Sequence, residues 1–251
     1  MIVAATPLYK GMMTKRVVFL HGSPGSAAVW SSLIARAPAD VECFAFDLLD
    51  HGAAPAAPRA LVDDVVDDVV TRVRALGGPV VLVGHSFGAW VAGRALPQLD
   101  GLVTKFVALA GVCGVDSEIA ARSLGFADAL EAGQLTLDGA VGAAASLWLP
   151  AAGPKEEETA ILQEIITGSS VTQLVRVLRR QAAISNPAIW VARHDVPGVA
   201  IHARGDRGVP LSMGKQLAAL GSKTEFVELD GDSHFPQWSH PEVVTQAVFE
   251  T

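Results

Sequence analysis

Residues 79–90 read Pro-Val-Val-Leu-Val-Gly-His-Ser-Phe-Gly-Ala-Trp, and this stretch decides the fold. The apolar run after the proline is typical of a strand buried on both faces of a parallel sheet. The small residues that follow open a predicted helix. Between strand and helix, Gly84 and Gly88 stand two residues before and two after Ser86. Glycines at these positions permit a sharp turn that exposes the serine.

Other apolar runs in the chain alternate with helical patterns, which favours an α/β fold with a mostly parallel central sheet flanked by helices. The last of these runs, at residues 225–229, contains Glu225 and Glu228, so we expect this strand near an edge of the sheet. The clearest helix covers residues 60–76, where valines recur at helical spacing and four aspartates form a solvated face. The five further predicted strands are 17–20, 43–46, 106–110, 199–203 and 225–229.

Between residues 110 and 199 the alternation gives way to helical patterns with no convincing strand. Ser170 and Gln173 fit a capping box that opens one of these helices. Arg176, Arg179 and Arg180 are interpreted as one solvated helix face. We therefore predict an α/β core formed by 15–110 and 195–251, with a helical cap at 111–194 inserted after the fourth predicted strand. Residues 1–14 form a separate N-terminal segment.

Composition narrows the class of protein. Of 251 residues, 50% are hydrophobic and 18% charged, which excludes a disordered chain. The net charge of −7 argues against nucleic-acid and anionic-membrane partners, because both need a basic surface. Cys43 and Cys113 stand far apart and read as buried thiols rather than a disulfide framework. With no signal-peptide pattern over residues 1–13, a cytoplasmic protein is expected; whether it forms a homodimer is left open.

A serine becomes a nucleophile only with an adjacent base and donors for the oxyanion. The loop His21-Gly22-Ser23-Pro24-Gly25 directly follows the strand at 17–20. We predict that the backbone N–H groups of Ser23 and Phe87 form the oxyanion hole. A Gly/Pro-rich loop also suits an ordinary turn, and only its place beside the Ser86 turn favours the functional interpretation.

Two further loops supply the partners of Ser86. Asp206 follows the strand at 199–203 and His234 follows the strand at 225–229, so both lie at the sheet edge where parallel α/β folds place their sites. We predict His234 as the base and Asp206 as the acid that orients it. Asp116 and Asp232 are weaker candidates for the acid. No histidines have metal-ligand spacing, and no metal or cofactor is expected.

The four motifs together make the chain resemble the α/β-hydrolase superfamily, in its small, cap-bearing, single-domain branch. The segment Asp47-Leu48-Leu49-Asp50-His51-Gly52 resembles the family's Asp-x-x-Gly-His-Gly loop, with Asp50 where glycine is usual. The resemblance implies cofactor-free hydrolysis of an ester, thioester, lactone or related bond.

We predict a serine hydrolase of carboxylic esters that acts through an acyl-Ser86 intermediate on a small or medium, largely apolar small-molecule substrate. Two alternatives stay open: a lactone or carbon–carbon bond hydrolase with the same residues, and a slow-turnover ligand receptor of the same fold. Arg204 and Arg207 are expected to be solvated rather than to meet an acidic substrate group. The candidate substrate-binding side chains are apolar and aromatic: Trp30, Trp148, Trp190 and Phe235.

Overall fold

The computed structural model describes residues 15–153 and 155–250 and contains one six-stranded sheet with the order β2-β1-β3-β4-β5-β6. All neighbouring strands are parallel. Each predicted strand is present, and β6 forms an edge as its glutamates indicated. The strands are β1 (Lys15–Leu20), β2 (Val41–Phe46), β3 (Val80–His85), β4 (Val103–Leu109), β5 (Gly198–Ala203) and β6 (Thr224–Leu229).

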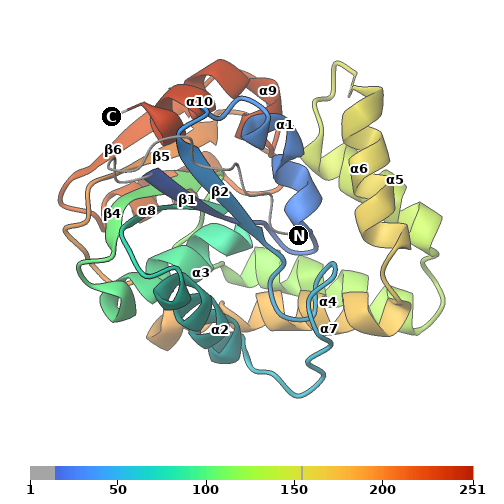
Figure 1. Ribbon diagram of the computed structural model, residues 1–251. Helices are drawn as coiled ribbons and strands as arrows, with labels where there is room; N and C mark the ends of the chain where they lie inside the picture. Colours follow the sequence, from blue (N-terminus) through green and yellow to red (C-terminus); the bar gives the residue numbers. More distant parts are fainter. Residues whose placement is uncertain (1–14, 154, 251) are drawn as a thin grey trace.

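Helices cover both faces of the sheet (Figure 1). On one face pack α2 (Val62–Ala75), α3 (Phe87–Ala95) and α8 (Leu211–Ala218); on the other pack α1 (Ser31–Ile34), α9 (Pro236–Ser239) and α10 (Pro241–Phe249). Alternate residues of β3 serve the two layers: Val80 and Leu82 join the first core, whereas Val81 and Val83 join the second. Burial on both faces explains why the central strands read as unbroken apolar runs.

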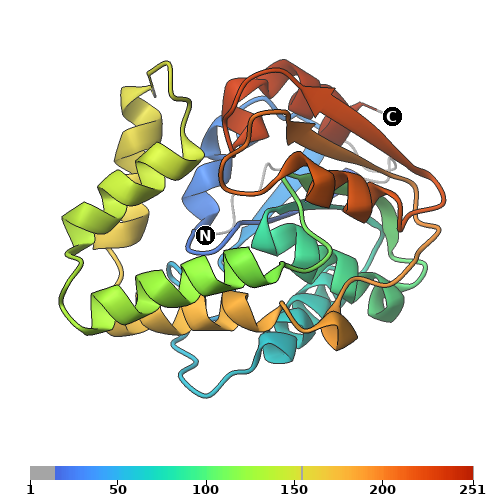
Figure 2. The same cartoon turned by 180° about the vertical axis from the view of Figure 1, so that it is seen from behind.

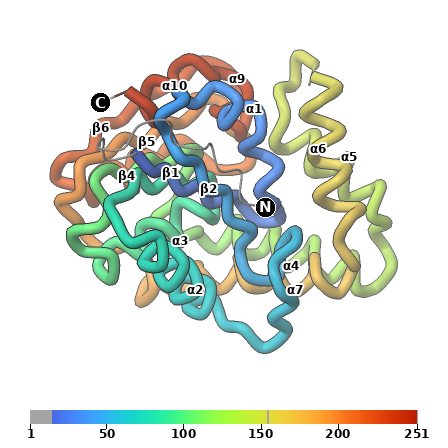
Figure 3. The backbone as a smooth tube through the Cα atoms, in the orientation of Figure 1, coloured from blue at the N-terminus to red at the C-terminus, as the bar shows by residue number. Residues whose placement is uncertain are grey.

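Among the described residues, four α-helices lie between β4 and β5: α4 (Ser117–Glu131), α5 (Leu137–Trp148), α6 (Glu156–Thr167) and α7 (Val171–Ala183). They form two packed pairs, α4 with α7 and α5 with α6 (Figure 2). The backbone trace in Figure 3 shows the α5–α6 pair set beside the core, next to α1. Ser170 caps α7 by accepting the Gln173 N–H at 3.1 Å, but the Gln173 side chain donates to the Asp50 oxygen, so only this half of the predicted capping box is present. No helix among the described residues is long and apolar enough to cross a membrane. The predicted N-terminal segment 1–14 lies outside the described residues.

The arginines of α7 correct one prediction. Arg176 donates two hydrogen bonds to Asp50, at 2.6 and 2.7 Å, and Arg180 is buried among backbone carbonyls of residues 49–60. Asp50 itself is fully buried and adopts a φ of 66°, in the left-handed region that glycine favours. The aspartate thus keeps the backbone shape of a glycine, because Asp tolerates this region better than most residues. Its carboxylate ties the loop to α7, so Arg176 and Arg180 are not a solvated face.

Gly84 brings α3 close to β3. A Cβ atom added at Gly84 would lie 2.5 Å from the Ala89 Cα and the Gly88 oxygen, both of them backbone atoms that cannot move aside cheaply. We expect Gly84→Ala to lower the free energy of unfolding by about 1–3 kcal/mol, the usual range for overpacking.

The matched control is Gly125→Ala within α4, where an added Cβ meets nothing within 4 Å. This change should leave stability unchanged or raise it by up to ~1 kcal/mol, because alanine has the higher helix propensity. Urea titrations of both variants measure the difference. Equal stability of the two would contradict the proposed close approach.

Candidate active site

Ser86 lies at the turn between β3 and α3, in a strained backbone conformation with φ 51° and ψ −117°. A Cβ at Gly88 would collide with the backbone oxygens of Leu20 and His21. Glycine is therefore needed on the helical side of the turn as well as at position 84. Strain of this kind persists only when the surroundings enforce it, and it is common at functional sites. The turn holds Ser86 at the start of α3, where its side chain lines a pocket.

The loop at residues 21–25 runs directly beside this turn. A Cβ on Gly22 would lie 3.1 Å from the Ser86 Cβ, so only glycine lets the two segments approach so closely. Ser23 and Phe87 line the same pocket as Ser86. Their position is compatible with the predicted oxyanion hole, and the role of their N–H groups stays a prediction.

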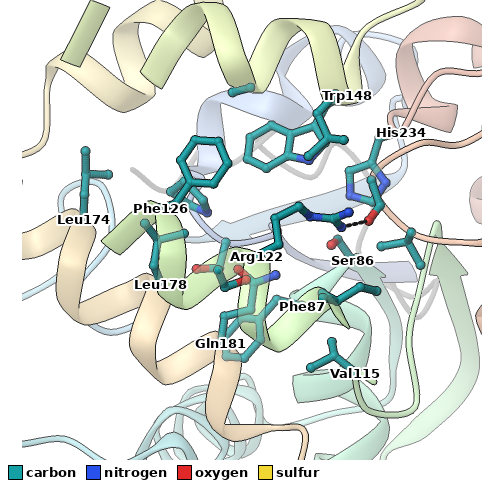
Figure 4. A pocket seen from close by; sticks show the side chains of 18 of the residues that line it. Ser86, Phe87, Val115, Arg122, Phe126, Trp148, Leu174, Leu178, Gln181 and His234 are labelled. Carbon is teal, nitrogen blue, oxygen red and sulfur yellow. Dashed lines mark hydrogen bonds between the residues drawn. The ribbon is translucent and has the colours of Figure 1, made fainter. Parts of the chain in front are cut away.

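The loops after β5 and β6 bring Asp206 and His234 together. The Nδ1–H of His234 donates a hydrogen bond of 2.7 Å to Oδ2 of Asp206, and both side chains are buried. With the proton on Nδ1, the Nε2 atom of a neutral imidazole is free to accept a proton. His234 lines the pocket together with Ser86, and Figure 4 shows the two side chains next to each other.

Asp206 accepts further hydrogen bonds that favour its ionised form. The N–H groups of Gly208 and Val209 donate to Oδ1 at 2.8 and 3.0 Å, and the His202 Nε2 lies 3.3 Å from Oδ2. Burial by itself would raise the pKa of Asp206, but His234 and His202 outweigh it and hold the pKa below its ordinary value. An ionised Asp206 is the form that can orient His234 and stabilise its protonated state.

The two weaker candidates for the acid occupy other positions. Asp116 caps α4, where its carboxylate accepts the Ile119 N–H at 2.9 Å. Asp232 pairs with Arg207 and accepts the Ala151 N–H at 3.0 Å. Arg207 also donates to the carbonyl oxygens of Ser146 and Leu149, so it fastens the end of α5 rather than projecting into solvent.

Three other histidines near Ser86 form hydrogen bonds in the loops. His21 accepts the Leu48 N–H through Nε2 and contacts the Gly22 oxygen through Nδ1. His51 contacts the Leu49 oxygen and, at 3.0 Å, the hydroxyl of Ser23. His85 contacts the carbonyl of His234 at 2.8 Å and stacks on Phe235. Burial lowers the pKa of His21 to about 4 and that of His51 to about 3, and lowers the pKa of His85 as well.

The pocket above Ser86 is walled mainly by apolar side chains of the four inserted helices (Figure 4). Trp148 lines it, and the backbone oxygen of Trp148 accepts the His234 N–H at 2.8 Å. Phe235 lines a small adjoining pocket that also contains Ser86 and His234. The apolar walls comprise Val112, Val115, Ile119, Phe126, Leu130, Leu147, Ile166, Leu174, Leu178 and Ile184.

Two predicted wall residues lie elsewhere. Trp30 is fully buried in the core, where its ring packs 5.2 Å from Phe19. Trp190 packs over Gly114 and donates its Nε1–H to the Ile184 oxygen at 3.0 Å. Trp30 is a core side chain and Trp190 a partly buried one packed against the core, and neither is among the residues that line the pockets at Ser86. A tryptophan near a catalytic segment in sequence need not face the site, since its large apolar surface is equally suited to the core.

Sequence reasoning missed Arg122, which lines the pocket from α4. A signal was present: at helical spacing, Arg122 stands between Ile119 and Phe126 on an otherwise apolar stripe. Among residues 15–153 and 155–250, no three His, Cys, Asp or Glu side chains group as metal ligands.

We expect Asp206→Asn to reduce turnover by on the order of 10³-fold or more, because an amide neither fixes the useful tautomer of His234 nor stabilises its cation. Asp116→Asn should retain activity, since asparagine is an equally good helix cap. Asp232→Asn should alter stability slightly and turnover little. Steady-state kinetics of the three variants decide between them, and a greater loss in either control would reassign the acid.

The buried histidines make stability depend on pH. Their pKa values in the folded protein lie below that of an exposed histidine, so the unfolded chain binds more protons between about pH 6.5 and pH 4. The free energy of unfolding should therefore fall as pH drops through this window, by up to ~1.4 kcal/mol per pH unit for each histidine. Urea titrations from pH 7.5 to 4.5 measure the slope. His51→Gln should flatten it, and an unchanged slope in that variant would contradict a neutral buried His51.

Comparison with known proteins places the chain in a family. The model of the alpha/beta hydrolase family matches residues 17–247. Over 133 residues the chain is 31% identical to Lipase LipV of Mycobacterium tuberculosis (strain ATCC 25618 / H37Rv), and this match covers 51% of each protein. The aligned part therefore spans about half the length of that relative.

Solved structures share the fold at low sequence identity. A thermophilic esterase from Thermogutta terrifontis is 18% identical, with a TM-score of 0.77 over 93% of this chain and 88% of its own. The enol-lactonase from Burkholderia xenovorans LB400 is 18% identical, with a TM-score of 0.76 over 94% of this chain and 90% of its own. At these identities the likeness shows the fold alone. Because the family model extends from β1 into α10, across every strand of the sheet, the chain belongs to the alpha/beta hydrolase family.

Proposed function

We propose that this protein is a serine hydrolase that cleaves carboxylic esters of small to medium acyl groups. The observation that carries the proposal is the 2.7 Å hydrogen bond that His234, a residue that lines one pocket together with Ser86, donates to Asp206. A nucleophile on a strained turn, a base and an orienting acid are the parts that acyl transfer to serine requires.

In the proposed reaction, Nε2 of His234 takes the Ser86 proton while Oγ attacks the carbonyl carbon of the ester. Asp206 stabilises the imidazolium that results. The N–H groups of Phe87 and Ser23 would hold the oxyanion. The imidazolium then protonates the leaving alkoxide, and the acyl group remains on Ser86. Water, activated by the same histidine, releases the carboxylic acid.

The neutral histidines around the site support this chemistry. His51 contacts the Ser23 hydroxyl at 3.0 Å, and the pKa of His51 is lowered to about 3. Because His51 stays uncharged at neutral pH, it can fix the loop of Ser23 without adding a positive charge that competes with His234 for Asp206. His85 likewise contacts the backbone of His234 while remaining neutral. These contacts pre-position the proposed oxyanion donor and base.

The dimensions of the pocket favour short acyl chains. Its open space is about 70 Å³, whereas an engineered cavity of about 150 Å³ in another protein admits benzene. An acyl chain of up to about four carbons therefore fits without displacement of the apolar walls. A lactone of similar size would follow the same steps, with the leaving alkoxide still tethered to the acyl carbon.

We expect purified protein to react with a fluorophosphonate probe at Ser86, and to hydrolyse p-nitrophenyl butyrate faster than the octanoate. Ser86→Ala should abolish labelling and lower turnover by on the order of 10³-fold or more. Peptide mapping identifies the labelled residue, and p-nitrophenol release measures the rates.

Ser146→Ala is the control, because the Ser146 hydroxyl donates to a carbonyl of its own helix, the oxygen of Ala143 at 3.1 Å. It should retain full activity. Retention of activity in Ser86→Ala would overturn the assignment of the nucleophile. Labelling without ester turnover would favour carbon–carbon bond hydrolysis or a slow-turnover receptor.

A further inference from the structure

One polar patch interrupts the apolar wall of the pocket. It consists of Arg122 and Ser123 on α4 and Gln181 on α7, two helices that pack side by side. Figure 4 shows the guanidinium of Arg122 and the amide of Gln181 on the same side of the pocket, below Phe126 and Trp148. Placing an arginine in such a wall is costly for an enzyme that binds only apolar groups, since a charge must be kept solvated or paired.

Arg122 differs from the arginines of α7 in its partners. Arg176 and Arg180 meet the carboxylate of Asp50, and Arg179 meets those of Asp128 and Glu131. Arg122 forms no ion pair with another described residue. Its Nη2 instead donates a hydrogen bond to the Gly208 oxygen at 2.5 Å. A guanidinium has five N–H donors, so a single carbonyl leaves most of them available.

The hydrogen bond to Gly208 places this charge near the proposed chemistry. Gly208 is the residue whose N–H donates to Asp206, and Gly208 and Val209 line the pocket together with Ser86 and His234. A ligand whose carbonyl carbon lies at Ser86 is therefore enclosed by the same wall that presents Arg122.

We propose that Arg122 binds a carboxylate of the substrate, and that the enzyme hydrolyses half-esters of short dicarboxylic acids. This inference rests on the proposed esterase function. Arginine presents a planar fork that matches a carboxylate with two parallel hydrogen bonds, and such pairs are strong in water-poor surroundings. The Gln181 amide supplies a further donor. The reaction converts the half-ester anion and water into the dicarboxylate, the alcohol and a proton, and the carboxylate bound by Arg122 is unchanged.

A purely structural role for Arg122 makes a different prediction. If the guanidinium served only to hold the Gly208 carbonyl, its loss would disturb Asp206 and slow the hydrolysis of every ester alike. If Arg122 recognises a carboxylate, its loss instead lowers kcat/KM only for anionic esters, mainly through a higher KM. The two roles are separated by a matched pair of substrates that differ in one charge.

The experiment compares monomethyl succinate with methyl butanoate, which have acyl chains of the same length, by measuring methanol release. Wild-type kcat/KM should be higher for monomethyl succinate. Arg122→Met should lower kcat/KM for this half-ester by about 10- to 100-fold, as expected for the loss of a hydrogen-bonded charge. The same variant should leave kcat/KM for methyl butanoate nearly unchanged. Arg122→Lys retains the charge without the fork and should give an intermediate loss.

Arg59→Met serves as the charge control, because Arg59 is exposed on the loop before α2. It should not affect either substrate. Equal losses on both esters in Arg122→Met and Arg122→Lys would overturn the proposal in favour of a structural role. If the wild-type enzyme cleaves methyl butanoate at least as fast as monomethyl succinate, carboxylate recognition is overturned but the proposed esterase function is not. Failure to cleave either ester, with no labelling of Ser86, would overturn both.

Discussion

The close approach of α3 to the sheet is the constraint on which the rest of the site depends. Glycines at 84 and 88 let the helix start within contact of β3 and the end of β1, and the chain can make this turn only if Ser86 takes a positive φ. The same turn brings Gly22 against Ser86. Strand pairing between β1 and β3 therefore fixes two loops relative to each other, so the proposed nucleophile and the proposed oxyanion loop form as one unit.

A second layer of interactions joins the inserted helices to this unit. Asp50, buried in the same loop as His51, receives two hydrogen bonds from Arg176 of α7. At the other end of the pocket, Arg207 binds the carbonyl oxygens at the end of α5, and the Trp148 oxygen accepts the N–H of His234. The helices that wall the pocket are thus bonded to the loop of His51, which contacts the Ser23 hydroxyl, and to the loops of Asp206 and His234.

The charges at the pocket are distributed in a way that suits an anionic substrate. Asp206 accepts three hydrogen bonds that favour its ionised form, and burial lowers the pKa values of His21, His51 and His85. Arg122 consequently stands out as the charged pocket residue on α4 whose donors are mostly uncommitted. An arginine in an apolar wall discriminates between ligands by charge, whereas the apolar side chains around it discriminate by size. The two proposals follow from these separate features of one pocket.

The sequence by itself determined the sheet and the positions of the candidate site residues along it. Unbroken apolar runs identify strands buried on both faces, and Gly-x-Ser-x-Gly after such a run admits few backbone geometries. Asp206 and His234 were predictable for the same reason, since parallel strands end at one edge. Tertiary structure decided which side chains of the helical insertion face inward. Trp190 packs against the core, Arg176 and Arg180 are partners of Asp50, and Arg122 lines the pocket; outside the insertion, Trp30 is buried in the core. Helical periodicity shows which residues share a face, but what that face meets depends on contacts between segments far apart in the chain.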